Sequence, residues 1–285
     1  MTTSLPFISD HVRIDGIVPG VRGQRAFPSP GLRDADPFLM LDHIGPGALP
    51  IDEVVDGAAH PHRGFETVSI FLNGSLDHVD SMGNRLRIGA GDLQVMNAGR
   101  GIIHGGDMRP DPDTGIFQEF QLWVNLPASM KMSEPTVQNV SASVIPVFTS
   151  DGIVTRVLSG TALNLKGPAR TRHPTTILHS KLAANTEHPA IRLPATYRVL
   201  CYLLNGQVSF GGSTLRPFQC MDLGIPGAGD LAFTSGSEGA EYLLLAGEPL
   251  REPVVFGGPF VMNTQTEIDQ AQSDYKAGVF GEVIK

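Results

Sequence analysis

Two histidines, His60 and His62, are separated by a single proline in the segment His60-Pro-His-Arg-Gly-Phe-Glu66. Side chains alternate between the two faces of an extended strand, so residues at positions i and i+2 point to the same side. A third histidine, His104, ends the strand-like run Gly99-Arg-Gly-Ile-Ile-His104. Neutral imidazoles that converge from neighbouring strands form transition-metal sites. The pattern therefore predicts that His60, His62 and His104 bind one metal ion.

The composition limits the classes of function that such a site can serve. The 285 residues suffice for one large or two small domains, and 41% of them are hydrophobic. A formal net charge of −8 argues against nucleic acid as the main partner. We find no signal peptide and no apolar run long enough to cross a membrane, so we expect a cytoplasmic protein. Cys201 and Cys220 each lie within an apolar run and are predicted to be buried free thiols.

Short strands must position the histidines, because glycine and proline interrupt the chain throughout: it holds 33 and 22 of them. Strand-like runs alternate with turn-forming residues. Asn73-Gly74 and Asn205-Gly206 stand between apolar runs, a pattern typical of two-residue hairpin turns. Many short strands with such separators indicate an all-β sandwich or barrel.

One helix is expected, over Thr264 to Gly278. Thr264 stands three residues before Glu267, which is the spacing of a capping box. Apolar residues then recur every three to four positions, as the buried face of a helix requires; they are Ile268, Ala271 and Tyr275.

Two parts of the chain repeat one another. Phe71-Leu-Asn-Gly-Ser-Leu76 matches Leu203-Leu-Asn-Gly-Gln-Val208, and Gly91-Asp-Leu93 matches Met221-Asp-Leu223. Both pairs are separated by about 130 residues, which indicates two copies of one β-unit. The second copy has no histidine at the positions that correspond to the three in the first copy, which are Arg192, Pro194 and Thr234. The chemistry is therefore predicted in the first half.

The motifs closely resemble those of the pirin family of the cupin superfamily. They span nearly the whole chain and include Asp36-Pro-Phe-Leu-Met-Leu-Asp-His43, His60-Pro-His-Arg-Gly-Phe-Glu-Thr-Val68, Ala98-Gly-Arg-Gly-Ile-Ile-His104, Gln121-Leu-Trp-Val-Asn-Leu-Pro127 and Gly258-Pro-Phe-Val-Met-Asn-Thr264. The resemblance implies two cupin-type jelly-roll β-barrels, a bicupin, with a short C-terminal helix. Residues 1–140 would form the metal-binding barrel, and residues 141–285 a barrel without metal ligands that ends in the helix. Pirins typically hold one iron, so we expect Fe(II) at the histidines, with Mn, Ni, Cu or Zn as alternatives.

The resemblance also implies a fourth metal ligand, a glutamate two residues after the third histidine, and here Gly106 takes its place. Glu66 follows His62 by four positions and would share its strand face. Asp107 would point inward if Gly105-Gly106 formed a bulge. Glu119 lies on the strand-like run that begins at Phe117. These three carboxylates and water remain the candidates for the fourth position.

Glu66 and Arg63 are also the candidate catalytic residues. A free glutamate near the metal could deprotonate a substrate hydroxyl. Arg63 could hold a carboxylate or an anionic substrate bidentately. The structural alternatives are a buried acid that hydrogen-bonds to Arg63 or the backbone, and a salt bridge. His78, on a strand with Asp77 and Asp80, is expected on a solvated face or in a turn hydrogen bond.

Two functions follow from the resemblance. Some pirins show quercetin 2,3-dioxygenase activity, which implies an enzyme that binds O2 and a flavonol-like aromatic substrate. Other pirins act as regulators, which implies a non-enzymatic metal or redox sensor that binds a protein partner. A bicupin whose metal site has decayed is the third reading, and Gly106 is the feature that favours it.

Overall fold

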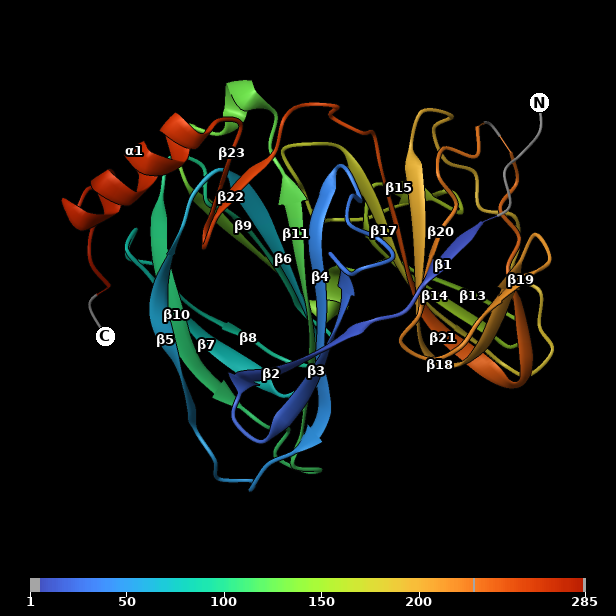
Figure 1. Ribbon diagram of the computed structural model, residues 1–285. Coiled ribbons are helices and arrows are strands. Elements are labelled where there is room, and N and C mark those ends of the chain that lie inside the picture. Colours follow the sequence, from blue (N-terminus) through green and yellow to red (C-terminus); the bar gives the residue numbers. More distant parts are fainter. Residues whose placement is uncertain (1–5, 228, 284–285) are drawn as a thin grey trace.

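Strands form nearly all of the regular structure, which confirms the predicted all-β class (Figure 1). The computed structural model describes residues 6–227 and 229–283. The strands form two barrels that lie side by side, the first in blue to green and the second mostly in yellow to orange (Figure 1). The expectation of two cupin-type barrels is therefore confirmed.

The first barrel has two sheets. The larger sheet has the strand order β12-β9-β6-β11-β4-β3-β2, and the smaller sheet has the order β5-β10-β7-β8. The strands are β2 (Val12–Val18), β3 (Val21–Phe27), β4 (Phe38–Ala48), β5 (Val55–His62), β6 (Phe65–Asn73), β7 (Ser75–Asp80), β8 (Arg85–Ile88), β9 (Leu93–Asn97), β10 (Ile102–Arg109), β11 (Ile116–Asn125) and β12 (Thr136–Val140).

The second barrel repeats the larger sheet in the order β1-β20-β18-β21-β17-β14-β13, with β19 paired to β18. Two short hairpins, β15–β16 and β22–β23, and the 3-10 turns η1 (Ala128–Met130) and η2 (Ala142–Val144) complete the strand framework. The strands are β1 (Phe7–Ser9), β13 (Val147–Ser150), β14 (Ile153–Ser159), β15 (Thr161–Ala162), β16 (Leu165–Lys166), β17 (Thr175–Leu182), β18 (Arg198–Phe210), β19 (Ser213–Leu215), β20 (Cys220–Asp222), β21 (Thr234–Gly247), β22 (Val255–Gly257) and β23 (Phe260–Met262).

The main hydrophobic core lies between the barrels, because alternate residues of the two large sheets pack back to back. On β11, Phe120, Leu122 and Val124 belong to this core, as do Leu200 of β18 and Leu243 of β21. The opposite faces of the two sheets point into the two barrel interiors. Burial of such apolar side chains stabilises the contact by about 1.5–3 kcal/mol for each large residue. Cys201 and Cys220 are buried free thiols, as predicted.

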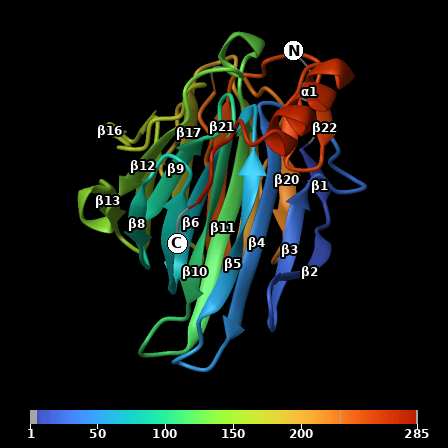
Figure 2. The same cartoon turned by 90° about the vertical axis from the view of Figure 1, so that its left-hand side faces the viewer.

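The two ends of the chain cross over to the other barrel. Strand β1, near the N-terminus, pairs with β20 of the second barrel. The C-terminal segment returns to the first barrel, where β22, β23 and the helix α1 (Gln265–Lys276) lie at one end of the barrel (Figures 1 and 2). Strand β23 packs on both sheets there, since Phe260 lies with Ile103 of β10 and Val261 with Phe65 of β6. The backbone N–H of Val261 donates to the carbonyl of Arg63 at 3.0 Å. The division at residue 140 predicted from the sequence does not anticipate this exchange.

The predicted C-terminal helix is present. Thr264 caps its N-terminus, and Glu267 completes the capping box. Ile268 and Ala271 are buried, as the apolar spacing predicts, whereas Tyr275, the third residue of that spacing, is 40% exposed. No helix in the described ranges is long and apolar enough to cross a membrane.

The two hairpin turns predicted at Asn-Gly are wrong. At Asn73-Gly74 the chain leaves the large sheet and enters the small one, because β6 and β7 belong to different sheets. At Asn205-Gly206 the strand β18 continues, and its register against β21 shifts on either side of this pair. Gly206 has a positive φ of 73°, which places the irregularity where a glycine tolerates it.

Candidate metal centre

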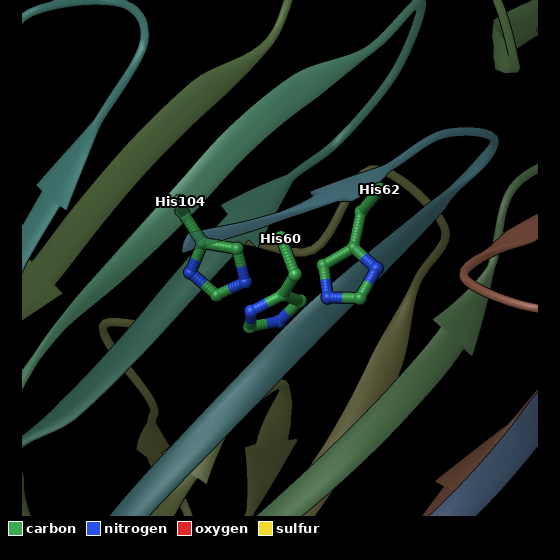
Figure 3. Close-up of side chains that lie close together, drawn as sticks. All are labelled: His60, His62 and His104. Carbon is green, nitrogen blue, oxygen red and sulfur yellow. The ribbon is translucent and has the colours of Figure 1, made fainter. Parts of the chain in front are cut away.

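The structure brings the three predicted histidines together on the small sheet of the first barrel (Figure 3). His60 and His62 share one face of β5, and His104 of β10 lies directly opposite His60 in the strand pairing. One ring nitrogen of each residue lies within 4.8 Å of the others. The ring centroids are separated by 4.5 Å for His60 and His104 and by 5.0 Å for His62 and His104.

Backbone carbonyls orient two of the imidazoles. The Nδ1 of His60 lies 2.9 Å from the carbonyl oxygen of Ala58, and the Nδ1 of His62 lies 3.2 Å from that of Pro259. Because a carbonyl can only accept, Nδ1 carries the proton and Nε2 keeps its lone pair. This is the arrangement in which outer hydrogen bonds prepare a histidine for metal binding.

His104 has no such partner. It is 7% exposed, and both of its ring nitrogens are buried without a hydrogen bond in the described part of the chain. An unpaired buried polar group costs free energy, so its presence calls for a ligand at this place. Burial lowers the pKa of His62 to about 3 and the pKa of His104 well below its usual value. Both imidazoles are therefore neutral, the form that binds a metal, and the three residues fit a transition-metal ion.

The bulge considered at Gly105-Gly106 is present, because the register of β10 against β5 shifts between His104 and Gly106. It does not turn Asp107 inward. The Asp107 side chain is 44% exposed and lies 4.0 Å from the Arg109 guanidinium. At Gly106, φ is +151°, and a Cβ atom would overlap the carbonyl of Asp77. The backbone at this bulge therefore suits glycine and supplies no carboxylate to the histidines.

Glu66 does not share the face of His60 and His62, and that prediction is wrong. Gly64, at a positive φ of 87°, turns the chain between β5 and β6, which belong to different sheets. The Glu66 carboxylate instead accepts the backbone N–H of Arg172, at 2.8 Å, between the barrels. Burial raises the pKa of Glu66 to about 7. Glu66 does not line the cavity next to the histidines.

Arg63 also points away from the histidines. Its Nε donates to the carbonyl of Arg100 at 2.6 Å, and its Nη1 donates to Asp274 of α1 at 2.7 Å. The guanidinium carbon lies 4.6 Å from the centroid of the Phe280 ring. Arg63 is 2% exposed, so the structure supports the salt-bridge alternative, in which this residue fastens the C-terminal segment to the first barrel.

A cavity of about 810 Å³ opens beside the histidines inside the first barrel. The strand β11 contributes every second residue to its wall: Glu119, Gln121 and Trp123. The Trp123 ring lies 5.4 Å from the His62 ring. Phe120 packs between the barrels, so Phe120 and Trp123 lie on opposite faces of β11.

Glu119 is the carboxylate candidate that does line the cavity. It is 7% exposed, and burial together with the charge of Asp42 raises its pKa to about 7. Its carboxylate does not belong to the group of ligand atoms that lie within 4.8 Å of one another. Glu119 is therefore a titratable group of the cavity, at a distance from the three nitrogens.

His78 is buried, with 1% of its surface exposed, so the expectation that it lies on a solvated face is wrong. Its Nε2 lies 3.1 Å from the Asp80 carboxylate, which also accepts hydrogen bonds from the following turn. The centroid of the His78 ring lies 5.6 Å from that of His104, so His78 is a neighbour of the three converging histidines.

Apart from Glu119, the polar residues of the large sheet that line the cavity were not predicted from the sequence, and neither were the residues from the C-terminal segment. Polar residues at alternate positions of β11 were a usable signal, because Glu119 and Gln121 interleave with the apolar Phe120 and Leu122. No local signal places Pro259, some 200 residues away in sequence, beside His62.

Two β-barrels packed on a common core, with three converging histidines in the first, define a bicupin with a metal-capable site. The Pirin model matches residues 20–124, and the model of the pirin C-terminal cupin domain matches residues 177–281. A pirin-like protein from Solanum lycopersicum is 38% identical over 90% of this chain and 86% of its own length. Human pirin is also 38% identical, over 90% of this chain and 87% of its own. The chain belongs to the pirin family.

A solved structure is similar over the whole molecule. The crystal structure of a quercetin 2,3-dioxygenase from Acinetobacter baumannii superposes with a TM-score of 0.89 and 32% sequence identity. The match covers 99% of this chain and 100% of that chain. The similarity therefore includes both barrels and the segments that cross between them.

Proposed function

We propose that this protein binds one divalent transition-metal ion through His60, His62 and His104 and oxygenates a flavonol-like aromatic substrate. The observation that carries the proposal is the convergence of three imidazoles, two of them deeply buried and neutral, on a cavity large enough for such a substrate. The similarity to the quercetin 2,3-dioxygenase from Acinetobacter baumannii supports this substrate class. Fe(II) is the metal we propose; imidazole ligands also suit Ni, Cu and Zn, and Mn is the remaining alternative.

A bound metal ion would supply a Lewis-acidic centre with positions open to substrate and O2. The residues of the chain have separate tasks around it. The three histidines hold the ion, and Trp123, next to His62, offers a flat apolar surface to an aromatic ring. Glu119 accepts a proton from a hydroxyl group of the substrate, for which a pKa of about 7 is suitable.

The proposal is tested on the full-length protein purified without a metal-affinity tag. Elemental analysis should find about one transition-metal ion per chain, and loading with Fe(II) without oxygen should restore any deficit. Addition of quercetin and O2 should then consume one O2 for each flavonol. Stoichiometric metal without oxygen uptake on any of the five metals would contradict the enzymatic proposal and favour the alternative, a metal or redox sensor that binds a protein partner.

A further inference from the structure

A row of polar side chains crosses the large sheet of the first barrel at a single register. Arg25 pairs with Asp42, and Asp42 pairs with Gln121. Gln121 pairs in turn with Ser69, and Ser69 with Gln94. All five residues line the cavity that the histidines also line. We call these five residues the polar row.

The polar row is only partly satisfied by its own hydrogen bonds. The Arg25 guanidinium donates to both oxygens of Asp42, at 2.7 Å each. The Ser69 hydroxyl donates to Oε1 of Gln121 at 2.8 Å. Within the described ranges, the amide nitrogen of Gln121 donates to no other residue, so its N–H groups are available to a molecule in the cavity.

The second barrel shows which residues the fold accepts at the positions equivalent to the polar row. The equivalent row there crosses the equivalent strands in the same order: Val157 pairs with Leu178, Leu178 with Leu244, Leu244 with Cys201, and Cys201 with Met221. All five belong to the apolar interior of that barrel. The architecture is therefore stable with an apolar row. Polar side chains on an inner wall are costly unless they are paired. Arg25 pairs with Asp42, Ser69 with Gln121, and Gln94 donates to Asn139 at 2.8 Å, so within the described ranges it is the amide N–H groups of Gln121 that indicate a bound molecule rather than a need of the fold.

Resting on the proposed function, we propose that the polar row is a second recognition subsite. It binds the hydroxyl groups of an aromatic ligand on the part of the molecule that lies away from the histidines. Gln121 lies two positions before Trp123 and on the same face of β11, which separates the two residues by about 7 Å along the strand. A ligand held at the histidines and against Trp123 therefore extends toward the row.

At the polar row, away from the histidines, the charges of the cavity wall favour neutral hydroxyl groups on the ligand over charged groups. Among the described residues, the wall carries the carboxylates Asp42, Asp56 and Glu119, and Arg25 is the one lysine or arginine that lines it. Because Arg25 already pairs with Asp42, a negatively charged group at the polar row meets no unpaired lysine or arginine among the described residues of the wall. A phenolic hydroxyl both donates and accepts, so it suits a wall that offers an amide N–H and carboxylate oxygens.

The test compares two flavonols that share the chelating 3-hydroxy-4-keto group. Quercetin carries additional hydroxyls on its other rings, and 3-hydroxyflavone carries none. The chain has a single tryptophan, Trp123, which lines the cavity, so quenching of its fluorescence reports binding. Titrations of the full-length protein without oxygen give both dissociation constants. We expect quercetin to bind about tenfold more tightly, the effect of one or two hydrogen bonds.

Variants of the row should change this ratio and not the binding of 3-hydroxyflavone. Gln121→Leu installs the residue that Leu244 provides in the second barrel, and it should weaken quercetin binding several-fold. Ser69→Ala, a smaller change, should have the same direction and covers the case in which Gln121→Leu does not fold. Gln265→Leu makes the same chemical change on the exposed face of α1, and it should leave the ratio at the wild-type value.

An equal affinity of the wild type for the two flavonols, or a ratio that neither Gln121→Leu nor Ser69→Ala lowers, would overturn the subsite. Oxygen uptake with both flavonols would then still support the proposed function. If neither flavonol binds or is consumed, the proposed function and the subsite are both refuted.

Discussion

The large sheets of the two barrels have corresponding strand orders, but the interiors of the two barrels differ in what fills them. The first barrel encloses a cavity with histidines on one sheet and the polar row on the other. The second barrel is filled by apolar side chains, among them Leu178, Leu244 and Phe233. At matched positions, Ser69 of the first barrel corresponds to Cys201 of the second, and Gln121 to Leu244. The difference shows that an apolar interior suffices for the fold, so the polar wall of the first barrel is not a requirement of the fold.

The largest expected effect concerns the metal. His62→Ala leaves only two of the three imidazoles, His60 and His104. The metal content should therefore fall from about one ion per chain to nearly none. Elemental analysis after dialysis measures it. His11→Ala, which changes a half-buried histidine beside Phe218, should keep the full metal content. Stoichiometric metal in His62→Ala would refute the assignment of the site.

A matched pair of truncations tests the contrast between the filled and the hollow interior. Leu244→Ala removes a fully buried side chain from the second barrel and should lower the free energy of unfolding by about 2–5 kcal/mol. Gln121→Ala, at the equivalent position of the first barrel, borders an existing cavity and should cost less than about 1 kcal/mol. Urea unfolding of both variants measures the difference. Equal losses would mean that the first barrel depends on its wall for packing as the second does.

The two buried glutamates of the first barrel, Glu66 and Glu119, are expected to differ in role: Glu66 affects stability and Glu119 affects the reaction. Because the pKa of Glu66 is raised from 4.5 to about 7, the folded state binds its proton more tightly than the unfolded state does. Its contribution to stability is therefore complete below pH 4.5 and is lost as the pH rises through about 7. Glu66→Gln keeps an acceptor for the Arg172 N–H and should be more stable than the wild type at pH 8, by roughly 2 kcal/mol. Thermal unfolding at pH 5 and pH 8 measures this, and a variant that gains nothing at pH 8 would contradict it.

Substitution of Glu119 should change the rate of flavonol oxygenation more than the free energy of unfolding. If its carboxylate form accepts the substrate proton, kcat/KM for a flavonol should rise about tenfold between pH 6 and pH 8, around a pKa of about 7. Glu119→Gln should flatten this profile, while Glu66→Gln should retain it. Steady-state oxygen uptake over this pH range distinguishes the two acids. A profile that keeps its shape in Glu119→Gln would assign the proton transfer to another group.

The sequence predicts the parts of this molecule that depend on local patterns. The i, i+2 spacing places His60 and His62 on one face of β5, and the Thr264–Glu267 pair marks the start of α1. The orientation of Glu66 could not be predicted, because it depends on the turn at Gly64 that carries the chain from one sheet to the other. The polar row is invisible for a similar reason: it joins residues from five strands whose register is fixed only by the assembled sheet.

The exchange of chain ends has a consequence for the order in which the site is made. The three histidines are synthesised in the first half of the chain, but the carbonyl of Pro259 that holds His62 comes close to its end. The fastening of this segment through Arg63 and Asp274 comes later still. During translation, the first barrel therefore emerges from the ribosome with its ligands present and one of them not yet oriented. The proposed metal centre depends on the segment that contains Pro259 and Asp274, so a product truncated before this segment would carry all three histidines of the site without the complete site.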